Sequence, residues 1–372
     1  MTALVVLTVG LVGLTAAGTL VVRGAAQLGV RFGLSPLVVG LTIVAVGTSA
    51  PELAVSLRAT AQGDPGLAVG NVVGSNIANV LLVLGLTALL GTIAVQARVV
   101  RIDVPVMIGV SLLLVLLAVD GELGRVDGTV LAAGAVGFIG WTLYAAKANG
   151  GDTALEEPAA DEPPPALLPN LLVVAVGTAL LVVAARLVVS GAEDLARAFG
   201  VPELVIGLTV VALGTSAPEL ATSLVAAARG ERDIAVGNVV GSNVFNILLV
   251  LGVTAVVSAT PVIVADQVLA LDLPVMTVAA VACLPVLAQG HRLERWEGGV
   301  FLIYYGAYLV FLGLEAAGHP ARDPFAVIML VFVVPLTVIT AATIAVRRRR
   351  PGPVLPTAAL TGAPTPSPTE NG

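Results

Sequence analysis

The chain has 372 residues, of which 57% are hydrophobic and only 11% are charged, and its formal net charge is −6. Soluble domains carry about 25% charged residues. The mean hydropathy of this chain is +1.02, so its composition excludes a water-soluble globular protein. The high apolar content also excludes a disordered chain, and the lack of a Gly-X-Y period excludes collagen. What remains is a protein that crosses a membrane many times.

Hydrophobic segments long enough to cross a bilayer recur along the whole chain. A spanning helix needs about 20 consecutive, mostly apolar residues. This criterion predicts eleven spans, at residues 2–22, 36–60, 67–91, 102–119, 128–146, 169–189, 203–227, 234–258, 268–288, 298–316 and 325–346. The first segment has no preceding basic residue and is longer than the apolar region of a signal peptide, so we expect it to be retained as a span.

Two segments have compositions that do not suit a membrane. Residues 148–168 are rich in Asp, Glu and Pro, and residues 347–372 begin with four arginines and continue in Pro, Thr, Ser and Gly. Such polar, Pro-rich stretches cannot bury enough apolar surface to fold alone. We predict an acidic linker and a disordered tail.

The positions of Lys and Arg predict the orientation, because basic residues accumulate in cytoplasmic loops. If the N-terminus is outside, the cytoplasmic residues are Arg23, Arg31, Arg98, Arg101, Lys147, Arg229, Arg232, Arg292, Arg295 and Arg347–Arg350. The outer set is smaller and comprises Arg125, Arg186, Arg197 and Arg322. We therefore expect a multi-pass plasma-membrane protein with a cytoplasmic C-terminus. The single lysine among the basic residues favours a bacterial source, hence the inner membrane.

An internal repeat is the most informative feature of the sequence. Residues 40–85 align without a gap with residues 207–252. Each repeat unit contains five predicted spans, and because five is odd the second unit starts on the opposite side of the membrane. Inverted repeats of this kind are typical of alternating-access transporters, whose substrate site lies near the midplane between the two copies. The eleventh span lies outside the repeat.

The motif Gly-Thr-Ser-Ala-Pro-Glu (GTSAPE) occurs in the middle of a hydrophobic span in each copy, at 47–52 and 214–219. Proline breaks a helix and frees a backbone carbonyl, which needs a partner within lipid. Carboxylates at this depth are costly and indicate function. The oxygen-bearing side chains are Thr48, Ser49, Glu52, Thr215, Ser216 and Glu219. A bound cation is a suitable partner for all of these oxygens.

A second motif, Gly-Asn-Val-Val-Gly-Ser-Asn (GNVVGSN), follows at 70–76 and 237–243. A spacing of four places its polar side chains on one helix face. These are Asn71, Ser75 and Asn79 in the first copy, and Asn238, Ser242 and Asn246 in the second. Oxygen ligands without thiolate or imidazole suit Na⁺, Ca²⁺ or Mg²⁺. For Asn71 and Asn238, helix capping and ion binding both remain open. For the glycines of the motif we favour helix packing.

The two motif pairs resemble the alpha-repeats of the cation/calcium exchanger superfamily, specifically its sodium/calcium exchanger branch, and the resemblance covers residues 1–317. It implies an all-α membrane fold of ten helices in two inverted five-helix halves, with long first and sixth helices that slide against the other eight. An extra C-terminal span would be added to this fold. The ion ligands that the resemblance implies are Thr48, Ser49, Glu52, Ser75, Asn79, Thr215, Ser216, Glu219, Ser242 and Asn246, with the backbone carbonyls of Ala45 and Ala212.

One departure from the family pattern concerns charge. Some microbial members have aspartate where Asn79 or Asn246 stands, and the amides leave this site with less negative charge. The number of bound ions and any proton coupling therefore stay open.

The repeat and the resemblance together predict five segments. The first exchanger repeat occupies 1–147, the cytoplasmic linker 148–168, the second repeat 169–317, the extra transmembrane helix 318–346, and the tail 347–372. With a single cysteine, Cys283, the chain cannot form an internal disulfide.

These features predict a calcium/sodium antiporter. Its partners are Ca²⁺ and Na⁺ as transported substrates and the lipid bilayer, with no nucleic acid; the oligomeric state stays open. The alternatives are a Ca²⁺/H⁺ antiporter, in which Glu52 and Glu219 carry the protons, and a passive cation channel. We expect no enzyme activity and no cofactor, because the sequence has no nucleophile–base set or cofactor loop. With no ATP-binding motif, the driving force is expected to be an ion gradient.

Overall fold

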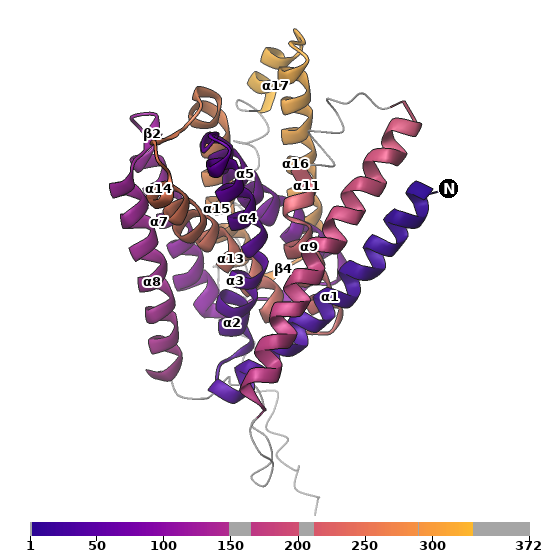
Figure 1. Cartoon of the computed structure of the whole chain (residues 1–372), viewed down its shortest axis with the longest axis vertical. Coiled ribbons are helices and arrows are strands. Elements are labelled where there is room, and N and C mark those ends of the chain that lie inside the picture. Colours follow the sequence, from indigo (N-terminus) through magenta and orange to yellow (C-terminus); the bar gives the residue numbers. More distant parts are fainter. Residues whose placement is uncertain (1, 149–164, 201–211, 289, 330–372) are drawn as a thin grey trace, which may run out of the picture.

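The computed structural model describes residues 2–148, 165–200, 212–288 and 290–329 (Figure 1). Within these ranges, nine helical segments are long and apolar enough to cross a membrane: Thr2–Phe32, Pro36–Ala61, Gly66–Leu90, Val99–Leu117, Arg125–Ala148, Leu167–Ala198, Arg232–Val257, Val268–Ala288 and Arg295–Ala316. They match nine of the eleven predicted spans. The spans predicted at 203–227 and 325–346 lie partly outside the described residues.

The first half of the chain consists of helices joined by short turns and two-residue strands. Its elements are α1 (Thr2–Phe32), α2 (Pro36–Val39), η1 (Gly40–Val44), α3 (Ala45–Thr48), α4 (Ala50–Ala61), α5 (Gly66–Ala78), η2 (Asn79–Leu84), α6 (Gly85–Leu90), β1 (Ile93–Ala94), η3 (Val99–Asp103), α7 (Val104–Leu117), β2 (Glu122–Leu123) and α8 (Arg125–Ala148). The elements named η are π-helical turns within longer helices.

The second half repeats this order. Its described elements are α9 (Leu167–Ala198), α11 (Ala212–Thr215), α12 (Ala217–Ala228), α13 (Arg232–Phe245), η5 (Asn246–Leu251), α14 (Gly252–Val257), β3 (Val262–Ile263), η6 (Val268–Asp272), α15 (Leu273–Ala288), β4 (Arg292–Leu293), α16 (Arg295–Ala316) and α17 (Arg322–Ile328). The π-helical turns η2 and η5 begin at Asn79 and Asn246, which are equivalent positions of the repeat. Such turns are rare and often occur at functional sites.

Short strands connect the two halves at two places. β1 pairs antiparallel with β4, with Ile93 opposite Leu293, and β2 pairs antiparallel with β3, with Glu122 opposite Ile263. Each pair joins a strand of one half to a strand of the other. The two halves are therefore interlocked rather than placed side by side as separate domains.

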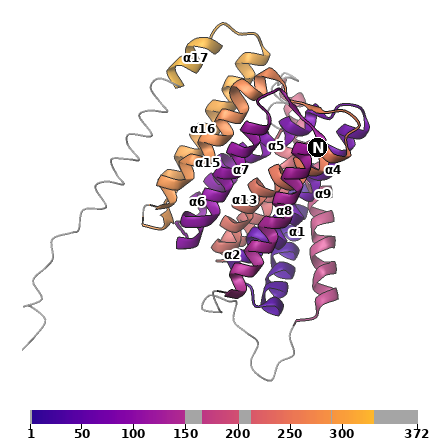
Figure 2. The ribbon, with the colours of Figure 1, turned by 90° about the vertical axis from the view of Figure 1, so that its left-hand side faces the viewer.

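Two long helices, α1 and α9, pack along each other at one side of the molecule (Figures 1 and 2). Their close approach depends on glycine. A methyl group on Gly10 would lie 2.7 Å from the amide nitrogen of Val188, and one on Gly191 would lie 2.6 Å from that of Leu7. Small residues allow membrane helices to pack backbone to backbone.

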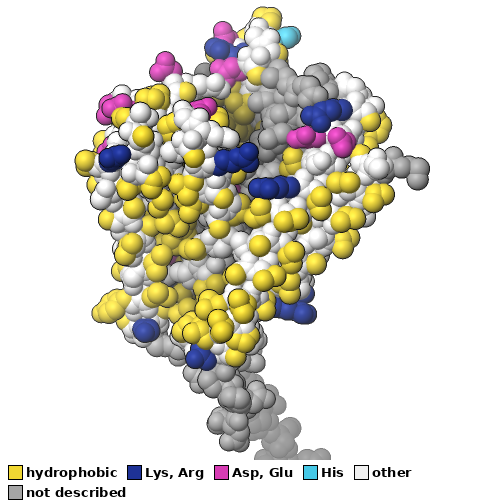
Figure 3. Space-filling model, in the orientation of Figure 1, with side chains coloured by type: hydrophobic (Ala, Val, Ile, Leu, Met, Phe, Trp, Pro, Cys, Tyr) yellow, Lys and Arg dark blue, Asp and Glu magenta, His cyan; other side chains and the backbone are white. Residues whose placement is uncertain are grey.

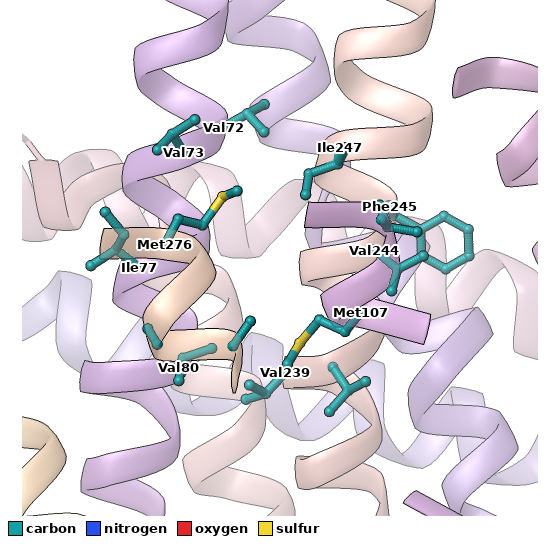
Figure 4. Packing of buried hydrophobic residues seen from close by; sticks show 14 of the residues in the cluster. Val72, Val73, Ile77, Val80, Met107, Val239, Val244, Phe245, Ile247 and Met276 are labelled. Atoms are coloured by element: carbon teal, nitrogen blue, oxygen red, sulfur yellow. The ribbon is translucent and has the colours of Figure 1, made fainter. Parts of the chain in front are cut away.

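The other helices surround a hydrophobic core that both halves build. Val72 and Ile77 of α5 lie near Met276 of α15, and Met107 of α7 lies near Val239 of α13 (Figure 4). On the outer surface, hydrophobic side chains cover the middle of the visible face and most charged side chains lie toward its two ends (Figure 3). This distribution suits a protein whose middle faces lipid.

The contact between α8 and α14 offers a test of this packing. A methyl group on Gly128 would lie 2.7 Å from Ala255 Cβ and 2.8 Å from the carbonyl oxygen of Gly252. Because backbone atoms cannot yield easily, we expect Gly128→Ala to lower the free energy of unfolding by about 1–3 kcal/mol. Thermal unfolding of detergent-purified protein would measure this loss. Gly137→Ala, on the same helix, is the control, because no described atom lies within 4 Å of its added methyl; equal melting temperatures for both variants would contradict the packing.

Candidate ion-binding site

Both GTSAPE motifs interrupt their helices, as predicted. In the first half α3 ends at Thr48 and α4 begins at Ala50, and in the second half α11 ends at Thr215 and α12 begins at Ala217. The proline of each motif stands at the start of the new helix, where its missing N–H costs nothing. Glu52 and Glu219 fall in the first turns of α4 and α12. The positive end of each helix dipole therefore lies at a carboxylate.

The predicted ligand side chains are almost completely removed from solvent and lipid. Thr215 is half-buried, and the others are 3% exposed or less: Thr48, Ser49, Glu52, Ser75, Asn79, Ser216, Glu219, Ser242 and Asn246. The two residues predicted to act through backbone carbonyls, Ala45 and Ala212, begin α3 and α11. Thus each copy of the repeat places its polar residues inside the protein.

Hydrogen bonds join the first motif of each half to the second motif of the other half. Thr48 Oγ1 donates to Asn238 Oδ1 at 3.0 Å and lies 3.2 Å from Ser242 Oγ. At the equivalent position, Ser75 Oγ lies 3.4 Å from Thr215 Oγ1. The structure therefore brings the four motifs together in one place. Thr48 Oγ1 also lies 3.3 Å from the carbonyl oxygen of Ala45.

Asn71 and Asn238 support the helix breaks and do not cap helices. Each lies inside its helix, since α5 begins at Gly66 and α13 begins at Arg232. The capping alternative is therefore wrong. Asn71 Nδ2 donates to the carbonyl of Glu52 at 3.4 Å, and Asn238 Nδ2 donates to the carbonyl of Glu219 at the same distance. Each amide also donates to a serine one turn after the glutamate: Asn71 to Ser56 Oγ at 3.4 Å, and Asn238 to Ser223 Oγ at 2.9 Å. These contacts hold each glutamate-bearing turn against the neighbouring helix.

Several buried polar atoms at this place lack a hydrogen-bond partner within the described part of the chain. In the first half they are Ser49 Oγ, both carboxylate oxygens of Glu52, and Oδ1 and Nδ2 of Asn79; in the second half they are Ser216 Oγ, both carboxylate oxygens of Glu219, and Oδ1 of Asn246. An unsatisfied buried polar group costs about 1–3 kcal/mol, and more if it is charged. Every one of these residues belongs to the predicted ligand set.

The charge of the site comes from two carboxylates. Glu52 and Glu219 lie close enough to interact electrostatically, with Ser75 beside the first and Thr48 beside the second. No group of three or more His, Cys, Asp or Glu residues that could hold a metal occurs among the described residues. The predicted ligands comprise two carboxylates with neutral hydroxyl and amide oxygens, a set that suits hard cations.

Two asparagines that the helix-face argument left out also belong to this cluster. Asn76 Nδ2 donates to the carbonyl of Asn243 at 3.1 Å, and Asn76 Oδ1 accepts from Asn246 Nδ2 at 3.1 Å. Asn76 and Asn243 are the last residues of the GNVVGSN motifs, so the repeat could have indicated them. Spacing by four excluded them, because it selects a single face of the helix.

Comparison with known proteins identifies the family. The family model described as sodium/calcium exchanger protein matches residues 2–144 and 169–314. The chain belongs to this family. The exchanger is 41% identical over 309 residues to the putative antiporter CaxA of Alkalimonas amylolytica, which covers 82% of this chain and 96% of the relative. It is 38% identical over 290 residues to the inner membrane protein YrbG of Escherichia coli, covering 76% and 87%.

The solved structures that match this chain have the fold of a sodium-calcium exchanger. The sodium-calcium exchanger NCX_Mj, soaked with Na⁺ and Ca²⁺, superposes with a TM-score of 0.67 at 28% identity, over 86% of this chain and 98% of that one. The expected ten-helix exchanger fold is therefore confirmed. The family consists of transporters rather than enzymes, and its ions are substrates that need no cofactor. The exchanger is a multi-pass membrane protein of this kind.

Proposed function

We propose that the exchanger carries Ca²⁺ against Na⁺ across the plasma membrane, by alternating access at a single site built from the two GTSAPE and two GNVVGSN motifs. One observation carries the proposal: buried oxygens that have no hydrogen-bond partner among the described residues come from equivalent positions of both halves, and hydrogen bonds and electrostatic contact join their motifs in one cluster. The proposed ligands are the oxygens of Thr48, Ser49, Glu52, Ser75, Asn79, Thr215, Ser216, Glu219, Ser242 and Asn246, with the carbonyls of Ala45 and Ala212.

The charge of this cluster accounts for the coupling of Ca²⁺ transport to Na⁺ transport at a single site. Two carboxylates balance one Ca²⁺, or more than one Na⁺ when hydroxyls and amides share the coordination. Without an ion, two buried negative charges face each other in a low-dielectric interior, which is unfavourable. The empty site therefore resists the conformational change, and ion movement in one direction requires ion movement in the other.

The contacts that α1 and α9 make with the helices of the motifs support alternating access, because these contacts differ between the two halves. A methyl group on Gly18 of α1 would lie 3.4 Å from Val225 Cγ2 of α12, and Arg229 Nη2 donates to Thr19 Oγ1 at 3.2 Å. The pair equivalent to α1 and α12 is α9 and α4, and these two helices make little contact among the described residues. We propose that the two contacts exchange during transport, one closing as the other opens.

We also propose the orientation and the division of the chain. The α1–α12 contact then lies toward the cytoplasm, because basic residues at the C-terminal ends of both helices, Arg31 and Arg229, are expected on that side. The two repeats, at 1–147 and 169–317, each supply half of the site. The cytoplasmic linker 148–168, the extra span 318–346 and the tail 347–372 lie outside the ion-binding machinery.

Reconstituted protein tests the coupling ion directly. We expect radioactive Ca²⁺ to enter proteoliposomes loaded with Na⁺ and not vesicles loaded with choline, because the outward Na⁺ gradient drives uptake. A third set of vesicles carries a pH gradient without Na⁺. Uptake in that set alone would move the protein to Ca²⁺/H⁺ exchange, and uptake that follows the Ca²⁺ gradient without any counter-ion would indicate a channel.

A further inference from the structure

We propose that Asn76 is a positioning residue that turns the amide of Asn246 so that its oxygen faces the ion, and that the equivalent Asn79 has no such support. The inference rests on the proposed function, because it concerns a ligand of that site. It predicts that two amides at equivalent positions of the repeat behave differently. Asn76 itself needs no contact with the ion.

A chain of hydrogen bonds fixes which atom of Asn246 is free. The Asn243 main-chain carbonyl can only accept, so the atom of Asn76 that lies 3.1 Å from it is the nitrogen. The oxygen of Asn76 must then be the atom that faces Asn246, and the group that it binds at 3.1 Å is the Asn246 nitrogen. Only the oxygen of Asn246 remains, buried and without a partner in the described part of the chain.

Burial makes this arrangement rigid. Asn76 is 1% exposed and Asn246 is fully buried. A flip of either amide would set two acceptors or two donors face to face, which is costly where water cannot compensate. The Asn76 nitrogen also lies 3.7 Å from Met276 Sδ, a second, weaker acceptor. The Asn246 oxygen is therefore held ready for a cation before the cation arrives.

Within the described residues, the amide of Asn79 in the other half has no equivalent support. Asn243, the repeat equivalent of Asn76, donates to the Val239 carbonyl of its own helix at 2.7 Å. Neither polar atom of Asn79 has a hydrogen-bond partner within the described residues. No described hydrogen bond therefore selects one orientation of the buried Asn79 amide, and in this proposal an ion that binds beside it selects the orientation. The exchanger then has one prepared amide oxygen and one adaptable one.

The test is a set of double-mutant cycles on the purified full-length protein, read as direct binding of radioactive Ca²⁺. Asn76→Ala removes one buried hydrogen bond to a ligand, and we expect it to weaken Ca²⁺ binding about fivefold. If Asn76 acts through Asn246, Asn76→Ala has no further effect in an Asn246→Ala background. In an Asn79→Ala background it keeps its full effect. A merely structural role would weaken binding equally in all three backgrounds, and that result would overturn the inference.

Two further measurements keep the outcomes distinct. If Asn76→Ala fails to fold, Asn76→Ser replaces it, because its hydroxyl preserves polarity but is too short to join Asn243 to Asn246; the same pattern across backgrounds is expected. Melting temperatures of all variants report folding separately from binding. Wild-type protein that binds no Ca²⁺ would reject the proposed function and this inference with it. Normal wild-type binding with unchanged affinity in Asn76→Ala would reject the inference alone.

Discussion

Replacing Glu52 or Glu219 by glutamine is expected to reduce Na⁺-driven Ca²⁺ uptake roughly 100-fold or more, with the protein still folded. Each substitution preserves the shape of the side chain and removes one of the two negative charges of the site. Loss of one partner from a buried ionic interaction costs about 3–5 kcal/mol, which corresponds to at least two orders of magnitude in affinity. Initial rates of Ca²⁺ uptake into Na⁺-loaded proteoliposomes measure the effect.

Glu122→Gln is the matched control for the two substitutions. Glu122 lies in β2 and is exposed, away from the four motifs. This variant should keep wild-type uptake, because it changes the net charge by the same amount without touching the site. Normal exchange in Glu52→Gln or Glu219→Gln would contradict the proposed mechanism, since a site with half its charge could not bind Ca²⁺ as proposed.

A disulfide between α1 and α12 is expected to stop exchange almost completely, and reduction is expected to restore it. The pair Gly18→Cys and Val225→Cys suits this bond, because a methyl group on Gly18 would lie 3.4 Å from Val225 Cγ2. Cys283 is the only cysteine of the chain and is buried, so Cys283→Ala provides a background without thiols. Uptake with and without reductant, in the same vesicles, measures the effect.

A second disulfide is the control that distinguishes blocked movement of α1 from a general loss of activity caused by cross-linking. The pair Gly13→Cys and Ala184→Cys joins α1 to α9, where a methyl group on Gly13 would lie 3.1 Å from Ala184 Cβ. If α1 and α9 move together against the other helices, this bond should leave exchange close to normal. Arrest by both bonds would mean that α1 and α9 move separately, and arrest by neither would mean that the α1–α12 contact stays closed during transport.

The candidate ligand residues could be named from the sequence because their chemistry is local to two motifs. The prolines in GTSAPE break the helices at Ser49 and Ser216, where the motif predicts, and the glutamates follow in the next turn. The resemblance to the exchanger superfamily named Ser49, Glu52 and Asn79 and their equivalents, and all of their buried side-chain polar atoms except Asn246 Nδ2 lack a hydrogen-bond partner in the described structure. The odd number of spans in each repeat predicted the inverted arrangement.

Features that depend on how one half packs on the other could not be predicted. Helix capping stood open beside ion binding for Asn71 and Asn238 because each lies near the predicted start of its helix, yet both helices begin several residues earlier. The pairing of β1 with β4 joins residues far apart in the chain that share no sequence signal. The different partners of Asn76 and Asn243 likewise arise only after folding, since identical motif positions carry no information about asymmetry.

Competition between the two ions in equilibrium binding tests the central claim most directly, because it needs neither a membrane gradient nor transport. Purified protein is saturated with radioactive Ca²⁺ and titrated with Na⁺, with choline as the control for ionic strength. A shared site predicts that Na⁺ displaces all bound Ca²⁺, that choline displaces none, and that the displacement curve is steeper than for a single competing ion. Ca²⁺ that stays bound at saturating Na⁺ would contradict a single site that alternates between the two ions.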